Sequence, residues 1–353
     1  MKIKLAILEK DLSYLNRIVN VFGTKYADKF QIYSFTDQEI AVSTVKSEKI
    51  EVIMVSSAFD FDVEQLPHRC AFAYLVDSAD VETFNGQRTI CKFQKADLIY
   101  KQILSLYSEN ASNVSGLKFG DDSSKIIVFE PVSGGVGCST MAAACATHFA
   151  SKKKKTLYLN LERFGSADSF FAAEGQFDMS DIIFALKSKK TNLPMKLEGC
   201  VKQTSSGVSF YSQTKVALDM LELSVEDILK LITELQLTGS YDYIIVDMDF
   251  SIAKDYLKIY RMAHAVVWVC DGSEISNSKL CRAYNALNIL EQNADSPITN
   301  RLSIIYNKFS NKTSKIITEI GVKNVGGAPF YVHTSTQQLM EQIAVMDMFD
   351  KIM

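Results

Sequence analysis

The chain has 353 residues, of which 47% are hydrophobic and 22% charged, a composition typical of globular domains that excludes collagen-like and Pro-rich disordered proteins. Its length predicts two or three domains, at roughly 100–200 residues each. The 38 basic and 41 acidic residues give a net charge of −3, so no field of the whole protein attracts nucleic acid or anionic lipid.

The seven cysteines form no CxxC pair, which favours reduced and mostly buried thiols. The N-terminal segment meets a charge too early for a signal peptide, and no apolar run approaches the roughly 18 residues of a membrane span. The densest basic run, Lys152–Lys155, is interpreted as a solvated helix end. The sequence therefore carries no strong nucleic-acid signal and no transmembrane segment, and we expect a cytoplasmic protein.

In the first third of the chain, short apolar runs alternate with helical patterns. Strands are predicted at Ile3–Leu8, Phe30–Tyr33, Val52–Val55, Ala71–Val76 and Thr89–Phe93, and helices at Leu12–Phe22 and Lys95–Tyr107. Five strand–helix units within one domain length predict a doubly wound parallel sheet of flavodoxin type.

This stretch resembles a response-regulator receiver domain. Receivers carry an acidic pair after the first strand, a phospho-acceptor Asp after the third and a Lys after the fifth. Here Glu9 and Lys10 stand at the pair, Ser56 at the acceptor, and Cys91 or Lys92 at the Lys. A serine hydroxyl cannot form an acyl phosphate, and Lys10 disfavours Mg²⁺. We therefore expect a receiver fold without phosphorelay chemistry, which serves docking or dimerisation.

Residues 109–124 are polar, Gly-punctuated and without apolar period, so we place a linker there, between domains at 1–108 and 125–353. In the second domain a helix is predicted at Met141–Ser151. Strands are predicted at Lys125–Glu130, Thr156–Leu161, Val208–Tyr211, Tyr243–Val246, Ala265–Cys270 and Leu302–Tyr306. Helical patterns lie between most of these strands, which predicts a second, mostly parallel α/β sheet.

The first of these strands runs directly into Ser133-Gly-Gly-Val-Gly-Cys-Ser-Thr140, and a helix follows. A glycine-rich turn in this position can aim successive N–H groups at phosphate oxygens, and the helix N-terminus adds its positive dipole end. Ser139 is placed to ligate Mg²⁺, and Thr140 to contact the α-phosphate. The sequence therefore predicts a phosphate-binding loop.

The loop resembles the deviant Walker A motif of the MinD/ParA ATPase family, usually Lys-Gly-Gly-x-Gly-Lys-Ser/Thr-Thr. Ser133 and Cys138 replace its two lysines. Because these cations act on the developing γ-phosphoryl charge, we expect ATP binding with weak or no hydrolysis. The resemblance implies that nucleotide is held by the whole loop: Ser133, Gly134, Gly135, Val136, Gly137, Cys138, Ser139 and Thr140.

Acidic motifs follow in the family's order. Asn160 and Glu162 stand at its Asp-x-Asp pair, whose second acid orients the attacking water. Asp247 ends the strand that places a carboxylate behind Mg²⁺, through water. The resemblance thus implies Glu162 and Asp247 as catalytic residues, and Ser139 with Asp247 as the metal site.

Two later segments resemble the family's adenine site. Asn307 and Lys308 stand at the strand end whose Asn reads adenine. Residues 326–331, which contain Pro329, resemble the adenine-flanking loop.

A degenerate receiver joined to a MinD/ParA-like domain resembles the TadZ/CpaE family, which localises the Flp-type (tight adherence) pilus and secretion machinery. Residues 159–162, 172–181 and 305–311 carry much of the likeness. The resemblance implies a homodimer with ATP and Mg²⁺ at the subunit interface and pilus-assembly or secretion components as partners. It also implies a focal or polar position at the assembly site, as a localisation hub.

Two alternatives stay open. An active ParA/MinD-type ATPase that cycles on a membrane or nucleoid would need a substitute cation near the γ-phosphate, such as Arg163 or Lys308. A nucleotide-free signalling adaptor would tolerate a bulky residue at Gly137. The loss of both lysines argues against the first, and the retained Ser139, Thr140 and Asp247 argue against the second.

Overall fold

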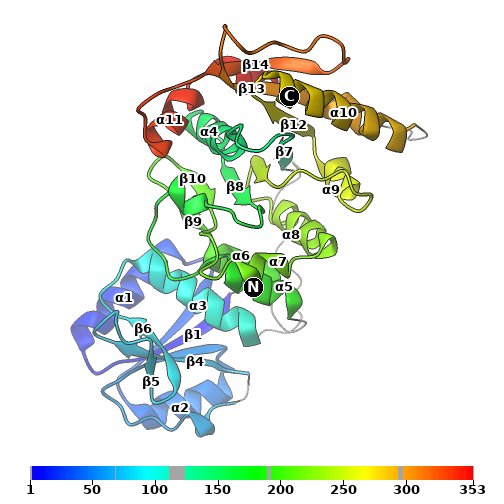
Figure 1. The fold of residues 1–353 in the computed structure, drawn as a ribbon. Helices are drawn as coiled ribbons and strands as arrows, with labels where there is room; N and C mark the ends of the chain where they lie inside the picture. The colour runs from blue at the N-terminus through cyan, green and yellow to red at the C-terminus, as the bar shows by residue number, and fades with distance from the viewer. Residues whose placement is uncertain (1, 68, 111–123, 189–191, 293–296, 353) are drawn as a thin grey trace. The chain divides into compact units, whose positions relative to one another are not determined.

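The computed structural model describes residues 2–67, 69–110, 124–188, 192–292 and 297–352. The chain divides into two compact units (Figure 1). The first takes in the chain as far as helix α3 and also the later segment that carries helix α6, and the second takes in the remaining elements. The predicted linker at 109–124 falls mostly on residues 111–123, outside the described residues.

The first unit is built on a sheet of strand order β2-β1-β3-β4-β6-β5. Neighbouring strands from β2 to β6 are parallel, and only β5 is antiparallel. This is the strand order of flavodoxin-type folds, so the predicted topology is confirmed. The strands are β1 (Ile3–Leu8), β2 (Phe30–Phe35), β3 (Val52–Ser56), β4 (Ala71–Val76), β5 (Thr83–Phe84) and β6 (Gln87–Cys91).

Helices cover both faces of this sheet. The helices are α1 (Leu12–Lys25), α2 (Gln38–Ser47) and α3 (Ala96–Asn110). Asp11 and Asp37 cap α1 and α2, each accepting hydrogen bonds from N–H groups of the first turn. The apolar sides of α1 and α3 pack on one face, and α2 packs on the other (Figure 1).

Two connections differ from the predicted alternation of strand and helix. The segment between β3 and β4 contains only a 3₁₀ turn at Val63–Gln65. Between β4 and β6 the chain folds back as the hairpin β5–β6, with Asn85 and Gly86 at φ 49° and 72°. Asn-Gly is the preferred pair for such a tight turn because both residues need positive φ. The prediction of five strand–helix units is therefore wrong for two of the five.

Helix α6 (Leu193–Cys200), although it follows the phosphate loop in sequence, packs against α3 in the first unit. Its Lys196 is buried and donates a hydrogen bond to the Ser105 hydroxyl at 2.8 Å. Gly199 permits the close approach, because a Cβ there would lie 3.2 Å from the backbone oxygen of Lys101.

The second unit contains an eight-stranded sheet of order β14-β13-β12-β7-β11-β8-β10-β9. All neighbours are parallel except β9 and β10. The predicted fold class, two parallel α/β sheets in one chain, is confirmed. The strands are β7 (Lys125–Pro131), β8 (Thr156–Asn160), β9 (Lys202–Gln203), β10 (Val208–Phe210), β11 (Tyr243–Asp247), β12 (Ala265–Cys270), β13 (Leu302–Phe309) and β14 (Lys323–Pro329).

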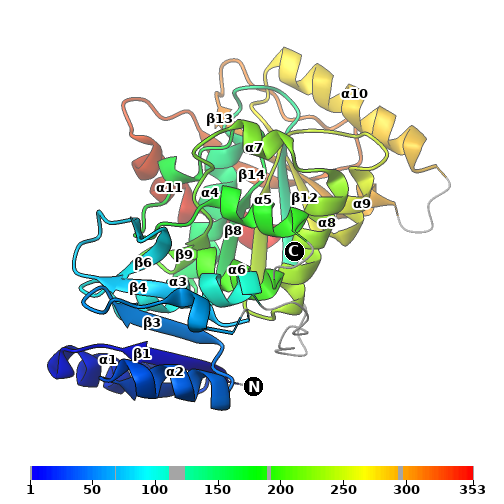
Figure 2. The same cartoon turned by 90° about the horizontal axis from the view of Figure 1, so that it is seen from below.

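Helices α4 and α11 lie side by side on one face of this sheet (Figures 1 and 2). Buried His148 of α4 bonds the Ala344 carbonyl and the Asp350 carboxylate, which joins α4 to the C-terminal segment. The described helices are α4 (Cys138–Ser151), α5 (Met179–Lys187), α7 (Leu218–Leu221), α8 (Val225–Leu237), α9 (Leu257–Met262), α10 (Glu274–Leu290) and α11 (Thr336–Ala344), with 3₁₀ turns at Ala167–Ser169, Ile298–Arg301 and Asp347–Lys351. No helix in the described part of the chain is both long and apolar enough to cross a membrane.

Strand β14 corrects a sequence prediction. Residues 326–329, expected in a loop, form the end of this strand, and Pro329 pairs with Phe309 of β13. The reason is steric: a Cβ at Gly327 would lie 2.5 Å from the Tyr306 carbonyl oxygen, so only glycine allows β14 this close to β13.

We predict that Gly327→Ala destabilises the second unit, because the strand pairing that orients the end of β13 must open. The expected loss is about 1–3 kcal/mol, as for other overpacked sites. Urea unfolding measures it. Gly321→Ala is the matched control, since a Cβ there meets no atom within 4 Å; equal unfolding midpoints for the two variants contradict the prediction.

Candidate functional site

The site lies at the carboxyl end of β7, in the middle of the second sheet. Strand β7 is flanked by β12 on one side and β11 on the other. The chain leaves β7 through α4 toward β8 and later returns to β12, so the strand order reverses here. In open α/β sheets, ligands bind in the crevice at such a switch point.

The phosphate loop joins β7 to α4 through two glycines in the left-handed region. Gly135 has φ 76° and Gly137 has φ 78°, conformations that other residues rarely adopt. Gly137 is also the N-cap of α4, and no side chain caps the helix. The first N–H groups of α4 are therefore left for an anion, in the strand–turn–helix context that the sequence predicted.

Two consecutive residues at the end of β13 hold the loop. The buried Asn307 donates its amide to the Val136 carbonyl at 2.8 Å. Lys308 donates its ammonium to the Gly135 carbonyl at 2.7 Å. The sequence predicted that Asn307 contacts adenine; its amide N–H lies against the loop, and the adenine contact stays a prediction.

A hydrogen-bonded carboxylate cluster lies beside the helix N-terminus. The Ser139 hydroxyl donates to Glu162 at 3.0 Å. The Asn160 amide donates to Glu162 at 3.1 Å and to Asp247 at 3.0 Å, and the Tyr158 hydroxyl donates to Asp247 at 2.7 Å. The structure thus brings together Ser139, Glu162 and Asp247, as predicted. Sequence reasoning missed Tyr158, although Tyr158, Asn160 and Glu162 alternate along one strand and its extension.

The electrostatics of this cluster are dominated by Asp247. Its side chain is fully buried, and its Oδ1 has no hydrogen-bond partner. Burial, and next the charge of Glu162, raise the pKa of Asp247 from 3.8 to about 8, against the lowering effect of the Tyr158 hydrogen bond. Burial and the same carboxylates also raise the pKa of the Cys138 thiol well above its usual range. Position 138 is therefore neutral, and Asp247 is mostly protonated at pH 7 unless a cation binds beside it.

This arrangement fits Mg²⁺ that arrives with a phosphate ligand. Hard oxygen donors are present in Ser139, Glu162 and Asp247, and an unpartnered buried carboxylate oxygen is the group that a cation or its water would satisfy. Within the described ranges, no group of three His, Cys, Asp or Glu side chains could hold a metal unaided. Phosphate oxygens would have to complete the coordination.

The remaining predicted residues lie nearby. Ser133 and Thr140 are partly exposed on the loop. Pro329 lines a pocket of about 260 Å³ between β13 and β14, together with Tyr306, Phe309 and Asn324. Asn307 is not among the residues that line this pocket, and a shared adenine site of Asn307 and Pro329 stays a prediction.

We predict that Asp247→Asn makes the stability of the second unit less dependent on pH. The unfolded Asp ionises near pH 4 and the folded one near pH 8, so its contribution to stability is full below about pH 4 and lost as the pH rises through about 8. At pH 8, without nucleotide, the variant should be several kcal/mol more stable, since one pKa unit corresponds to about 1.4 kcal/mol.

Urea unfolding at pH 5 and pH 8 measures this effect. The exposed Asp255→Asn is the matched control, because its ion pair with Lys258 is largely solvated and contributes little. Identical pH dependence in wild type and Asp247→Asn contradicts the prediction.

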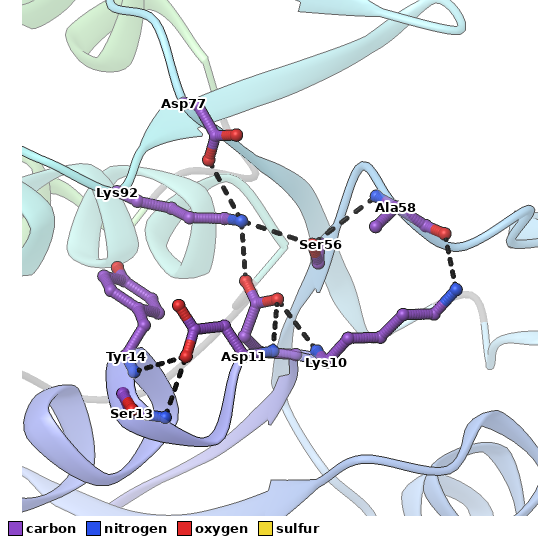
Figure 3. Close-up of polar contacts among 9 residues, drawn as sticks. Lys10, Asp11, Ser13, Tyr14, Ser56, Ala58, Asp77 and Lys92 are labelled. Carbon is purple, nitrogen blue, oxygen red and sulfur yellow. Dashed lines mark hydrogen bonds and ion pairs between the residues drawn. The ribbon is translucent and has the colours of Figure 1, made fainter.

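A second polar cluster lies in the first unit, where a receiver would be phosphorylated (Figure 3). Ser56 ends β3 at the acceptor position, so no carboxylate stands there. Lys92, rather than Cys91, enters the cluster: its ammonium lies 2.8 Å from Glu9, 3.1 Å from Asp77 and 3.4 Å from the Ser56 hydroxyl. The expected receiver fold without an acceptor is present.

An internal ammonium neutralises the acidic side chains of this cluster. Burial lowers the pKa of Lys92, but its hydrogen bonds to Glu9 and Asp77 and their charges outweigh burial and raise the pKa above its usual value. Lys10, which was expected to disfavour Mg²⁺, donates its ammonium to the Ala58 carbonyl (Figure 3). The cation that neutralises the buried Glu9 is therefore Lys92.

We predict that Lys92→Met destabilises the first unit by about 3–5 kcal/mol, because it leaves the charge of buried Glu9 without its partner. The double variant Glu9→Gln/Lys92→Met should recover most of this loss. Lys10→Met, which removes an exposed ammonium, should cost under about 1 kcal/mol. Chemical unfolding measures all three; a Lys92→Met loss no larger than that of Lys10→Met contradicts the prediction.

Comparison with known proteins assigns a family to the N-terminal domain. Residues 1–108 match the family model described as the TadZ-like receiver domain. No curated protein gives a significant match to the chain.

Solved structures that resemble this chain include MinD and ParA proteins. A ParA family ATPase from Chlorobium tepidum is 22% identical and covers 65% of this chain and 96% of its own, with a TM-score of 0.49. The MinC:MinD complex of Aquifex aeolicus is 16% identical and covers 65% of this chain and 96% of its own, with a TM-score of 0.48. MinD of Pyrococcus horikoshii, complexed with Mg-ADP, is 15% identical and covers 63% of this chain and 94% of its own, with a TM-score of 0.40. With a TadZ-like receiver domain at residues 1–108, the chain is similar to the TadZ/CpaE proteins.

Proposed function

We propose that the second unit binds ATP with Mg²⁺, and that the protein is a localisation hub for assembly of a Flp-type pilus or secretion system. The observation that supports nucleotide binding is the meeting of two features at one switch point. An uncapped helix N-terminus follows a glycine loop, and beside it Asp247 has a buried oxygen without a hydrogen-bond partner.

The residues divide the work of binding between them. Loop and α4 N–H groups would hold phosphate oxygens, while Ser139 would offer its hydroxyl to the metal and Asp247 would hold metal-bound water. Mg²⁺, when bound, would neutralise phosphate charge and relieve the repulsion between Asp247 and Glu162. Tyr158 and Asn160 keep the Asp247 carboxylate in place by donating to its Oδ2.

Hydrolysis would be weak or absent on this proposal. Positions 133 and 138 carry Ser and a neutral Cys where a developing γ-phosphoryl charge would require cations. Glu162, the candidate for orienting water, already accepts hydrogen bonds from Ser139 and Asn160. The site is thus better suited to retaining a nucleotide than to turning it over.

The hub role is supported by the TadZ-like receiver domain. Because Ser56 stands where a receiver would be phosphorylated and Lys92 neutralises Glu9 beside it, this domain would serve as a constant docking or dimerisation module and not as a phosphorylation switch. The proposed active form is a homodimer with nucleotide at the subunit interface, focused at the assembly site by pilus or secretion components. Nucleotide bound only by the dimer would stabilise it by mass action.

We predict that the protein binds ATP with micromolar affinity in the presence of Mg²⁺, and that Gly137→Ala weakens binding by more than about tenfold. The reason is that a Cβ at Gly137 would lie 2.5 Å from the Asn307 amide, at a φ of 78°. Calorimetry with ATP and ADP measures affinity, light scattering follows mass, and Gly321→Ala is the control.

Three outcomes would contradict parts of the proposal. No binding by wild type up to millimolar ATP would leave the loop as a structural turn and favour the nucleotide-free adaptor. Mass unchanged by ATP would remove nucleotide from the dimer interface. Phosphate release at rates typical of enzymes, about 1 s⁻¹ or faster, would favour the cycling ATPase.

A further inference from the structure

The phosphate loop contains no positive charge of its own. Its eight residues from Ser133 to Thr140 include no Lys, Arg or His, and the Cys138 thiol is neutral. The neighbouring side chains of Glu162 and Asp247 are acids and supply no positive charge either. A polyphosphate at this loop would therefore require a cation from elsewhere in the chain, in addition to any metal.

Lys308 places an ammonium at the loop. Its Nζ donates to the Gly135 carbonyl at 2.7 Å. Its Cε lies 3.7 Å from the position that a Cβ of Gly137 would take. The side chain thus passes along the loop from Gly137 to Gly135, yet it remains exposed. A long, exposed side chain can exchange its carbonyl partner for an anion without unfolding its surroundings.

The backbone at the end of β13 is shaped to bring Lys308 here. In a regular strand, consecutive side chains point to opposite faces. Asn307 and Lys308 nevertheless both contact the same loop, because the register between β13 and β14 is irregular from Tyr306 to Phe309 and Lys308 has φ 54°. A left-handed residue other than glycine is costly and persists only where its surroundings fix it.

We propose that Lys308 supplies the positive charge that the phosphate loop lacks, with its ammonium bonding a phosphate oxygen of the bound nucleotide. This inference rests on the proposed ATP binding. The ammonium reaches the site from the end of β13 and not from α4, so the chain retains one charge-assisted contact although Ser133 and Cys138 replace both lysines. The position of the charge differs from that of a P-loop lysine, which enters from the helix N-terminus.

The test separates a phosphate contact from mere support of the loop. Lys308→Met removes both the charge and the donor, whereas Lys308→Gln removes the charge and keeps an N–H donor on a side chain that is one atom shorter. Both replacements are unbranched, like lysine, so the cost of φ 54° stays similar. Lys312→Met removes an equal charge from the exposed loop after β13 and is the matched control.

Calorimetry with ATP, ADP and AMP at fixed Mg²⁺ gives the readout. A lost charge-assisted hydrogen bond corresponds to about a ten- to hundredfold lower affinity. We expect this loss for ATP in both Lys308 variants, a smaller loss for AMP, and no loss in Lys312→Met. Cys138→Lys in the Lys308→Met background should restore part of the affinity, since it returns a lysine to the loop. Because Cys138 is buried, the unfolding midpoint of this last variant is checked first.

The outcomes are distinct. Lys308→Gln binding ATP as tightly as wild type overturns the inference, as does an equal loss for ATP, ADP and AMP, which identifies a supporting role only. In both cases wild-type binding, and with it the proposed function, stands. Wild type that binds no ATP up to millimolar concentration overturns the proposed function and this inference together.

Discussion

The second unit is organised around one buried acid, Asp247, whose ionised form has no compensating cation. Burying an ionised carboxylate costs several kcal/mol unless partners repay the lost hydration. Tyr158 and Asn160 offset part of this cost by donating hydrogen bonds to Oδ2 of Asp247. Its Oδ1 has no hydrogen-bond partner, and the charge of Glu162 repels the ionised form. Strands β8 and β11 and the start of α4 meet at this cluster. The fold therefore fixes the geometry of the cluster, and a bound cation would stabilise the ionised form of Asp247.

The two units treat the same structural situation in opposite ways. In each, acidic side chains gather at the carboxyl ends of parallel strands, where a metal and phosphate could bind. In the first unit, Lys92 lies between Glu9 and Asp77 and neutralises the cluster from within. In the second, no ammonium reaches Asp247 among the contacts of the described residues, and Lys308 bonds the loop. The first cluster is thus self-contained, and the second is suited to an external ligand.

Much of the fold could be predicted because alternating and continuous apolar runs mark buried strands; β1, β4 and β12 lie at the predicted bounds. The phosphate loop could also be predicted, because its glycines lie close together in sequence between a strand and a helix. Most of the structural features that the sequence did not predict depend on tertiary contacts. The packing of α6 in the first unit and the pairing of β14 through Gly327 each require a partner segment distant in sequence. The hairpin at Asn85 differs, because its Asn-Gly turn is a local signal that the sequence prediction missed. The sequence identified Lys308 as a candidate residue, but it could not predict where the side chain points. That direction depends on the irregular register between β13 and β14.

A site can retain a nucleotide without hydrolysing it when its positive charge lies at a different position from the loop lysines. Binding needs compensation of the ground-state phosphates, which backbone N–H groups, a metal and one flexible ammonium can supply. Turnover needs rigid donors aimed at charge that develops only in the transition state. A buried neutral Cys138 offers no such donor, and an exposed Lys308 at the end of β13 is held by one carbonyl. On the proposed function, this redistribution makes ATP a long-lived structural ligand, so that assembly would follow nucleotide occupancy and partner concentration instead of a hydrolytic cycle.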